Sequence, residues 1–232
     1  MIMGIAFTIA AYGVYAGFWI RFFAHLLVWW RAARHAPPER ASGLRLRILS
    51  SMLLVRDVIF FWRLLSVNPA LWLGEWVFHV SFVLVILRHL RYFLDPVPCW
   101  VWDLQLPGLL AGYILPFSLL YILAVRLFTK QEKYSSRANM FLLILLLAIS
   151  TIGLAMCWLH TPNLVDVKFF AFGIVTMSPA AFPEGALFLL HFTLVLVFIL
   201  FVPSHIVAAP LVMYEARKRD LGLKTVMHDK QM

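Results

Sequence analysis

Four of the eight histidines lie in two strongly apolar stretches of the sequence. His79 and His89 are ten residues apart in one stretch, and His191 and His205 are fourteen apart in the other. An ionisable side chain is costly inside a bilayer and therefore usually faces a partner or a cavity. Because neutral imidazole is a good ligand for iron, these four residues are candidates for holding metal within a membrane.

If the two stretches are antiparallel helices, the histidines form pairs at two depths. The rise is ~15 Å within the first stretch and ~21 Å within the second, so His89 lies level with His191, and His79 with His205. At ~100° per residue, a gap of fourteen returns to within ~40° of the same face, whereas a gap of ten is ~80° off it. Two facing histidines at each depth suit two six-coordinate haems between the helices.

Two other interpretations of the histidines remain. They could hydrogen-bond to neighbouring helices and serve helix packing. Zinc fits less well, because no carboxylate or cysteine joins either pair at liganding distance in sequence. The cysteines, Cys99 and Cys157, match no metal or redox spacing, and C-x-x-C-H is absent, which excludes attached c-type haem.

The composition is that of a membrane protein. Hydrophobic residues make up 63% of the 232 residues and charged residues 13%, whereas a soluble domain is about half apolar and about a quarter charged. An ordinary water-soluble globule is excluded, and so are the disordered, collagen-like and disulfide-scaffold classes. Lipid cannot satisfy exposed backbone amides, and no alternating pattern suggests a barrel, so the sequence predicts an all-α bundle.

Five apolar runs are long enough to cross a ~30 Å hydrocarbon core as helices. They cover about 2–30, 73–93, 104–125, 140–160 and 186–207. The first run is too long for a signal-peptide core and is predicted to be a retained span. The segment at about 49–72 is interrupted by three charges and is predicted to lie along the cytoplasmic interface, since a sixth span there would cost several kcal/mol. The chain, 1–232, is predicted to be one membrane domain with a cytoplasmic tail at 213–232.

The distribution of the +9 formal charge predicts the orientation. Sixteen of the 20 basic residues lie in three segments, 31–72, 126–137 and 217–230. These segments share one side of the membrane if there are five spans. By the positive-inside rule, the N-terminus then faces out and the C-terminus faces the cytoplasm, in the inner membrane of the cell. The surplus of positive charge is therefore not a sign of nucleic-acid binding.

One stretch of the sequence carries a family resemblance. Residues 78–89, with Phe-His and a second histidine ten residues on, resemble the second helix of the respiratory nitrate reductase gamma subunit family. The run Arg126-Leu127-Phe128-Thr129 is also similar, as is Leu190-His191 followed by Pro203 and Ser204. The resemblance covers most of residues 73–215.

The sequence also departs from that family. The family's last histidine comes about one turn later than His205, and a lysine near the start of its third helix has no clear counterpart at 103–109. These departures favour relatives in the same superfamily, namely the cytochrome b subunits of sulfite-reduction-associated, high-molecular-weight cytochrome and heterodisulfide reductase complexes.

The resemblance implies a cytochrome b subunit of a respiratory oxidoreductase complex. Such a subunit carries two b-type haems and transfers electrons between a quinone, with menaquinone expected, and a cytoplasmic iron–sulfur subunit. Quinol would be oxidised at the outer side, although the reverse direction, quinone reduction, is also open. By this pattern His89 and His191 hold the outer haem, and His79 and His205 the inner one.

Arginines near the histidines are further candidates for cofactor binding. Arg88 and Arg91 flank His89, and they could pair with haem propionates, bind a quinone headgroup or extend to the lipid headgroups. Arg21 lies inside the first span and is predicted to have an acidic or propionate partner. His25, four residues later on the same helical face, would join it.

A proton or quinone site is predicted at the outer side. His160 ends the fourth span close to Asp166 and is a candidate proton acceptor from quinol, although it could also be an interfacial histidine without a role. Asp95 and Glu184 are the carboxylates placed to relay protons outward. The aromatic residues and prolines of the long loop 161–184 would suit a lid over a quinone pocket, but interfacial anchoring explains them as well.

The alternative function is that of a haem-free subunit that anchors a complex or conducts protons. The histidines would then serve helix packing or proton transfer. A small transporter is a third possibility, but no repeat or pair of broken helices supports it.

Overall fold

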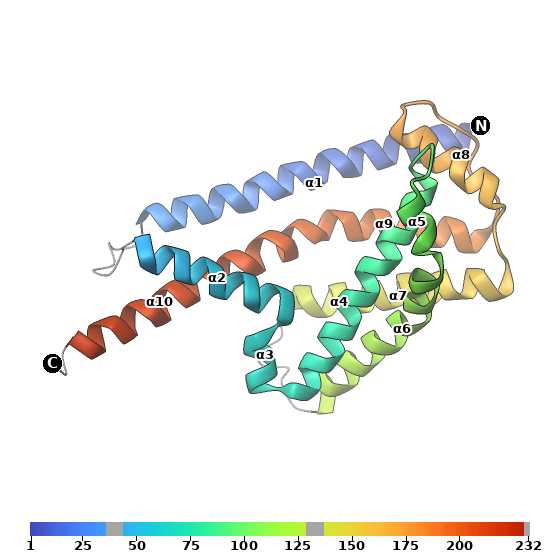
Figure 1. Ribbon diagram of the computed structural model, residues 1–232. Coiled ribbons are helices and arrows are strands. Elements are labelled where there is room, and N and C mark those ends of the chain that lie inside the picture. Colours follow the sequence, from blue (N-terminus) through green and yellow to red (C-terminus); the bar gives the residue numbers. More distant parts are fainter. Residues whose placement is uncertain (36–43, 129–136, 230–232) are drawn as a thin grey trace.

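The computed structural model describes residues 1–35, 44–128 and 137–229, and every regular element in these ranges is a helix (Figure 1). Arg40, Lys130, Lys133 and Lys230, which contribute to the predicted orientation, lie outside them. Five helices of the described chain are long and apolar enough to cross a membrane, namely Ile2–Ala32, Pro69–Tyr92, Gln105–Phe128, Arg137–Leu159 and Ala186–Leu221. The predicted fold class, an all-α bundle with five such helices, is confirmed.

The elements follow one another with short connections. The first half of the chain forms α1 (Ile2–His35), α2 (Leu44–Phe60), α3 (Trp62–Val67), α4 (Pro69–His89) and the 3-10 turn η1 (Leu90–Tyr92). The second half forms α5 (Cys99–Asp103), α6 (Gln105–Phe128), α7 (Arg137–Leu159), α8 (Leu164–Val175), α9 (Ala186–Pro203), the π-helical turn η3 (Ser204–Ala208) and α10 (Ala209–Asp229). The segment 161–184, expected to be a loop, thus contains a helix, and most of the segment expected to be a tail is the helix α10.

Local sequence signals explain where two of the helices begin. The Asn68 side chain accepts a hydrogen bond from the Leu71 amide at 3.0 Å, and Pro69 occupies the first turn of α4. Asn163 caps α8 in the same way through the Val165 amide, also at 3.0 Å. Both positions follow the preference for asparagine at helix N-caps, and Pro69 follows the preference for proline just after the cap.

The connections gather at two ends of the molecule. At the end that carries α8, Lys168 forms an ion pair with Asp95 at 3.0 Å, and the Tyr12 hydroxyl donates to the Ile174 carbonyl. At the opposite end, α2 lies against α10 (Figure 1). We refer to these as the α8 end and the α10 end. In Figure 1, α1 ends beside α2 at the α10 end and α6 ends near α3, whereas the N-terminus lies at the α8 end.

The main apolar core lies between α4, α6 and α7. Its buried members are Leu71, Phe78, Leu115, Leu119, Ile122, Leu143 and Leu146. α4 and α6 approach closely because Gly74 has no side chain, since a Cβ there would lie 2.7 Å from the Tyr121 ring. Small residues commonly permit such close approaches between membrane helices. This packing fixes α4, which carries two of the four candidate histidines.

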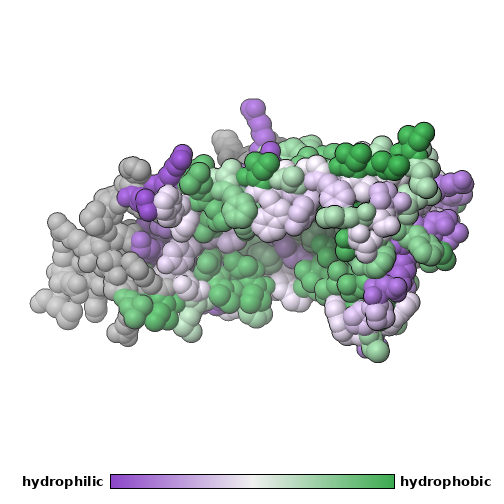
Figure 2. All heavy atoms as spheres, turned by 90° about the horizontal axis from the view of Figure 1, so that it is seen from above, coloured by the Kyte–Doolittle hydropathy of each residue, from purple (hydrophilic) through white to green (hydrophobic). Residues whose placement is uncertain are grey.

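The outside of the bundle is largely apolar. Hydrophobic residues cover much of the face shown in Figure 2, and hydrophilic residues lie mainly at its right-hand end and toward the grey atoms at its left. Among the exposed large hydrophobic residues, Phe117 on α6 and Ile9 on α1 are each 66% exposed. An apolar exterior of this kind is what a lipid environment requires, because lipid tails solvate apolar side chains.

Candidate functional site

The four candidate histidines face one another from two elements. His79 and His89 lie on α4, His191 lies on α9, and His205 lies in the π-helical turn η3 that continues α9. The imidazole rings of His79 and His205 have their centroids 6.4 Å apart and their planes 22° from parallel. His89 and His191 lie on α4 and α9, the helices that also meet through the rings of Phe82 and Phe198. The structure thus brings His79 and His205 into contact, and the pairing of His89 with His191 stays a prediction.

The inner pair has a spacing that suits one shared metal. A metal bound at an imidazole nitrogen lies roughly 3 Å from the ring centroid, so two rings on one metal have centroids roughly 6 Å apart. The 6.4 Å between His79 and His205 agrees with this value. We use "inner pair" for His79 and His205, and "outer pair" for His89 and His191.

Hydrogen bonds fix the protonation pattern of three of the rings. Nδ1 of His79 bonds to the Glu75 carbonyl and Nδ1 of His89 to the Val85 carbonyl, both at 2.7 Å. Nδ1 of His191 bonds to the carbonyl of Ile149 on α7 at 3.1 Å. A carbonyl oxygen only accepts, so each Nδ1 carries the proton. Nε2 is then the nitrogen with a free lone pair, as metal-ligating histidines require. These three imidazoles therefore have the protonation pattern that a haem ligand needs.

The backbones of α4 and α9, the helices that carry the histidines, are not in close contact. α4 packs closely on α6, and α9 packs closely on α1 and α7, but α4 and α9 are not a closely packed pair. Phe82, which lies between His79 and His89 on α4, meets Phe198, which lies between His191 and His205, with ring centroids 5.9 Å apart. An aromatic contact therefore separates the inner pair from the outer pair.

A glycine on α7 leaves room for the imidazole ring of His191. A Cβ added to Gly153 on α7 would lie 3.2 Å from Cε1 of His191. Contacts that short are rare for real Cβ atoms, so a larger residue would push against the imidazole ring. Gly153 thus allows His191 to lie against α7 and to donate to the Ile149 carbonyl.

An ion pair that the sequence analysis did not anticipate stands beside the inner pair. Oε1 of Glu75 accepts from Arg126, near the end of α6, at 2.7 Å. Oε2 of Glu75 is 3.9 Å from Nδ1 of His79. The spacing of Glu75 and His79 by four residues on one helix was a signal for this contact. The sequence analysis used Arg126 as a basic residue at the start of a loop and as part of the family resemblance, but it gave Arg126 no partner.

Arg88 and Arg91, which flank His89 in the sequence, have side-chain partners on α6 and in η1. Arg91 donates to Oε1 of Gln105 at 2.7 Å, and Nε of Arg88 donates to the same oxygen at 3.4 Å. Arg91 also donates to the Tyr92 hydroxyl. Gln105, at the start of α6, is a residue that the sequence analysis missed. It turns both guanidinium groups toward α6.

Arg21, for which an acidic or propionate partner was predicted, has an aromatic neighbour. Its guanidinium carbon lies 5.3 Å from the centroid of the Phe201 ring, a cation–π distance. No acidic partner of Arg21 is found in the described ranges. Because Phe201 is one turn before His205, Arg21 nevertheless lies near the level of the inner pair. His25 follows it by one turn on α1 and is half-buried.

The residues proposed for a proton or quinone site divide into two groups. A pocket of about 590 Å³ at the α8 end is lined by His160, Asp166 and Glu184, together with Phe169 and Phe182. Asp95 and Arg91 do not line it, since Asp95 is exposed and paired with Lys168, and Arg91 bonds to Gln105. The structure thus brings His160, Asp166 and Glu184 together.

An aromatic cluster connects this pocket with the region of the outer pair. Phe182, at the pocket wall, packs on Phe188 and Phe192 of α9 with ring centroids 5.4 and 6.2 Å apart. Phe192 directly follows His191 in the sequence. Phe170 of α8, which is 1% exposed, completes the cluster. The pocket therefore lies over an apolar layer that leads toward His191.

Within the described ranges, no group of three or more histidine, cysteine, aspartate and glutamate side chains could hold a metal ion. Cys99 and Cys157 are both exposed and free.

Five long apolar helices enclosing two histidine pairs define the class of protein, a multi-pass membrane protein. The chain is 32% identical over 150 residues to an Hdr-like menaquinol oxidoreductase cytochrome b-like subunit of Archaeoglobus profundus, covering 57% of this chain and 44% of that protein. It is 30% identical over 184 residues to the subunit of the same name from Archaeoglobus fulgidus, covering 72% of this chain and 53% of that protein. The chain thus spans about half the length of the curated relatives it matches.

No protein-family model and no solved structure matches the chain. The similarity to the two archaeal subunits confirms the predicted resemblance to cytochrome b membrane subunits of heterodisulfide-reductase type.

Proposed function

We propose that the protein is an electron-transfer subunit that holds two b-type haems and exchanges electrons between a quinone and a cytoplasmic iron–sulfur partner. The observation that carries the proposal is the arrangement of four histidines in two facing pairs. The Nδ1 hydrogen bonds support it, because they leave Nε2 available for iron in three of the four rings. The relatives support it too, since both are named menaquinol oxidoreductase cytochrome b-like subunits.

In this proposal the protein supplies ligands, orientation and an apolar environment. Each haem, when bound, carries one electron at a time. His89 and His191 hold the haem nearer the α8 end, and His79 and His205 hold the one nearer the α10 end. Arg88 and Arg91 offer positive charge to the propionates of the outer haem or to a quinone headgroup, and Arg21 offers it near the inner haem.

The pocket at the α8 end is the proposed quinone site. Menaquinone is the expected substrate, since both relatives are named for menaquinol. His160 is positioned to accept a proton from quinol, and Asp166 and Glu184, on the same pocket wall, are positioned to pass it to water. The phenylalanine cluster beneath the pocket excludes water between it and His191. Quinone reduction would use the same groups in reverse.

The proposed orientation places the α8 end outside the cell membrane and the α10 end in the cytoplasm. The basic residues of the α10 end would then face both anionic lipid and the iron–sulfur partner. A partner that carries acidic residues around its cluster would be steered toward this end.

The experiment that tests the function is reduction of the purified protein by a reduced menaquinone analogue. We expect b-type absorption bands to appear in the reduced-minus-oxidised spectrum and to be reoxidised by added quinone. If the purified protein shows no b-type bands after expression with sufficient haem, the haem-free anchor or proton-conducting subunit becomes the better description.

Replacing His160 by alanine is expected to slow quinol-driven haem reduction. The reduction rate should fall roughly 10²-fold, at the lower end of what a positioned proton acceptor contributes. Reduction by dithionite should be unchanged, because it needs no quinone site. Stopped-flow measurement at the b-type bands gives both rates.

The matched control for His160 is Thr176→Ala. Thr176 also lies at the α8 end, but its hydroxyl donates to the Phe172 carbonyl of its own helix at 2.9 Å, and it does not line the pocket. Equal quinol-driven rates in the wild type, His160→Ala and Thr176→Ala would exclude His160 from the quinone site.

A further inference from the structure

The inner pair and the outer pair have different charged neighbours. The inner pair has a carboxylate, Glu75, beside one of its rings. The outer pair has two arginines, Arg88 and Arg91, both of which donate to the neutral Gln105. Among the described residues, no acidic side chain forms an ion pair with either arginine. Nor does any described carboxylate lie within ion-pair distance of His89 or His191, so in the described chain a carboxylate beside a ring is a feature of the inner pair.

Glu75 contacts His79 in two ways. Its backbone carbonyl accepts the Nδ1 hydrogen of His79 at 2.7 Å, and Oε2 of its carboxylate is 3.9 Å from the same nitrogen. The ring of Phe61, 4.7 Å from that of His79, packs on the imidazole as well. The carboxylate thus stands next to the nitrogen that does not bind metal. Groups in that place orient a ligating imidazole and increase its basicity.

Arg126 holds Glu75 in this position from a different helix. It lies near the end of α6 and bonds Oε1 at 2.7 Å, which leaves Oε2 directed toward His79. Both side chains are largely buried, with Glu75 15% and Arg126 19% exposed. Charges in such surroundings are screened less than charges on the surface. Both also interact electrostatically with His205, the second ring of the inner pair.

Charge near a haem changes its reduction potential in a predictable direction. The oxidised haem carries one more positive charge than the reduced haem. A nearby carboxylate therefore stabilises the oxidised form and lowers the potential, whereas a nearby cation stabilises the reduced form and raises it. Net charge and hydrogen bonding around the ligands are known means by which proteins set these potentials.

We propose that Glu75 and Arg126 are a pair of positioning residues that sets the reduction potential of the inner haem, with opposite contributions. Glu75 lowers the potential through His79, and Arg126 raises it while it holds Glu75 in place. The effect is confined to the inner haem, because the outer pair has no corresponding carboxylate in the described chain. This inference rests on the proposed function, since it requires a haem between His79 and His205.

The test is a spectroelectrochemical redox titration of the purified haem-loaded protein, with four variants. Glu75→Gln keeps the size of the side chain and is expected to raise the midpoint potential of one haem component. Arg126→Gln is expected to lower the potential of the same component. The double variant Glu75→Gln/Arg126→Gln is expected to return toward the wild-type value, and Arg126→Lys, which keeps the positive charge, to stay near it.

A variant that lacks one histidine of the inner pair identifies the haem component whose midpoint potential shifts. It should be the component that is absent from His205→Ala. The matched control is the ion pair of Arg63 with Asp220, which spans 3.6 Å at the α10 end and is exposed. Asp220→Asn and Arg63→Gln are expected to leave both midpoint potentials unchanged.

Three results would overturn the inference while the proposed function stands. These are shifts of the same sign in Glu75→Gln and Arg126→Gln, no shift in either, or shifts of the component that survives in His205→Ala. Simple structural damage would produce the first of these, or a loss of the component. A wild-type protein without b-type bands would instead contradict the proposed function itself.

Discussion

Replacing His89 or His191 by alanine is expected to remove one of two b-type haems and leave the other. Both residues belong to the outer pair, and each supplies one of the two axial nitrogens there. Loss of either leaves an iron with one protein ligand in an apolar site, where the remaining imidazole still bonds to a backbone carbonyl. We expect the haem content, measured as pyridine haemochrome per chain, to fall by about half.

The inner-pair variants provide the complementary result. His79→Ala and His205→Ala should remove the other half of the absorption, and a variant from each pair combined should leave no b-type bands. Thr193→Ala is a matched control on the helix of His191, because its hydroxyl bonds only to the Leu189 carbonyl of its own helix, at 2.8 Å. An unchanged haem content in both His89→Ala and His191→Ala would rule out the outer haem.

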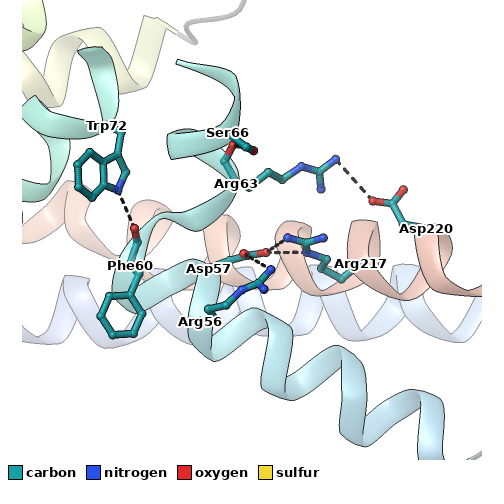
Figure 3. Close-up of polar contacts among 8 residues, drawn as sticks. All are labelled: Arg56, Asp57, Phe60, Arg63, Ser66, Trp72, Arg217 and Asp220. Atoms are coloured by element: carbon teal, nitrogen blue, oxygen red, sulfur yellow. Dashed lines mark hydrogen bonds and ion pairs between the residues drawn. The ribbon is translucent and has the colours of Figure 1, made fainter. Parts of the chain in front are cut away.

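The second large effect is expected on stability, from Asp57→Ala. Asp57 on α2 is 1% exposed, and its Oδ2 accepts from Nε and the terminal nitrogen of Arg217 on α10 at 2.6 and 2.5 Å (Figure 3). Arg56 approaches its other oxygen at 3.6 Å. Removing one partner of a buried ion pair leaves an uncompensated charge and costs about 3–5 kcal/mol. We expect α2 to detach from α10 before the bundle unfolds.

Limited proteolysis and thermal unfolding in detergent measure this effect. Asp57→Ala should expose α10 to cleavage and lower the midpoint of unfolding. Arg63→Gln removes the exposed pair between Arg63 of α3 and Asp220 of α10, shown beside it in Figure 3, and should cost at most about 1 kcal/mol. If the two variants were equally resistant to protease and to heat, the buried ion pair would not be what holds α2 to α10.

Most of the fold could be predicted from the sequence because lipid imposes simple demands. A span must be long, apolar and helical, so hydropathy alone locates it to within a few residues. The predicted spans at 104–125 and 140–160 correspond to Gln105–Phe128 and Arg137–Leu159. Length and hydropathy could not predict α8 or the helical continuation of α9 into α10, because these segments carry polar and charged residues and depend on local capping and contacts.

The pairing of the histidines could be predicted from their depth in the membrane, but not from the helical face on which each one lies. Ideal helical geometry placed His79 and His89 on different faces of one helix, and His191 and His205 about 40° apart. In the structure α4 runs obliquely to α9 (Figure 1), and α9 passes after Pro203 into a π-helical turn that carries His205. Proline cannot donate to the preceding turn, so a change of helical pitch is favoured there. Spacing in a sequence does not show such departures from the regular helix.

The polar neighbours of the pairs were missed because they come from other helices. Gln105 and Arg126 lie at the two ends of α6, and their partners on α4 depend on how the two helices are packed. Asp57 and Arg217 are 160 residues apart in the sequence. Their ion pair joins a charge that interrupts the apolar segment 49–72 to a charge in the predicted tail, and so connects α2 with α10. A single sequence shows that such charges need partners but does not show which partners they find.

The central claim is that two haems are held one above the other between α4 and α9. The most direct test is the haem stoichiometry of the purified protein together with its low-temperature reduced-minus-oxidised spectrum. The account predicts two b-type haems per chain, with one lost in His191→Ala and the other in His205→Ala. A protein with no haem, or one whose single haem survives in both variants, would contradict it.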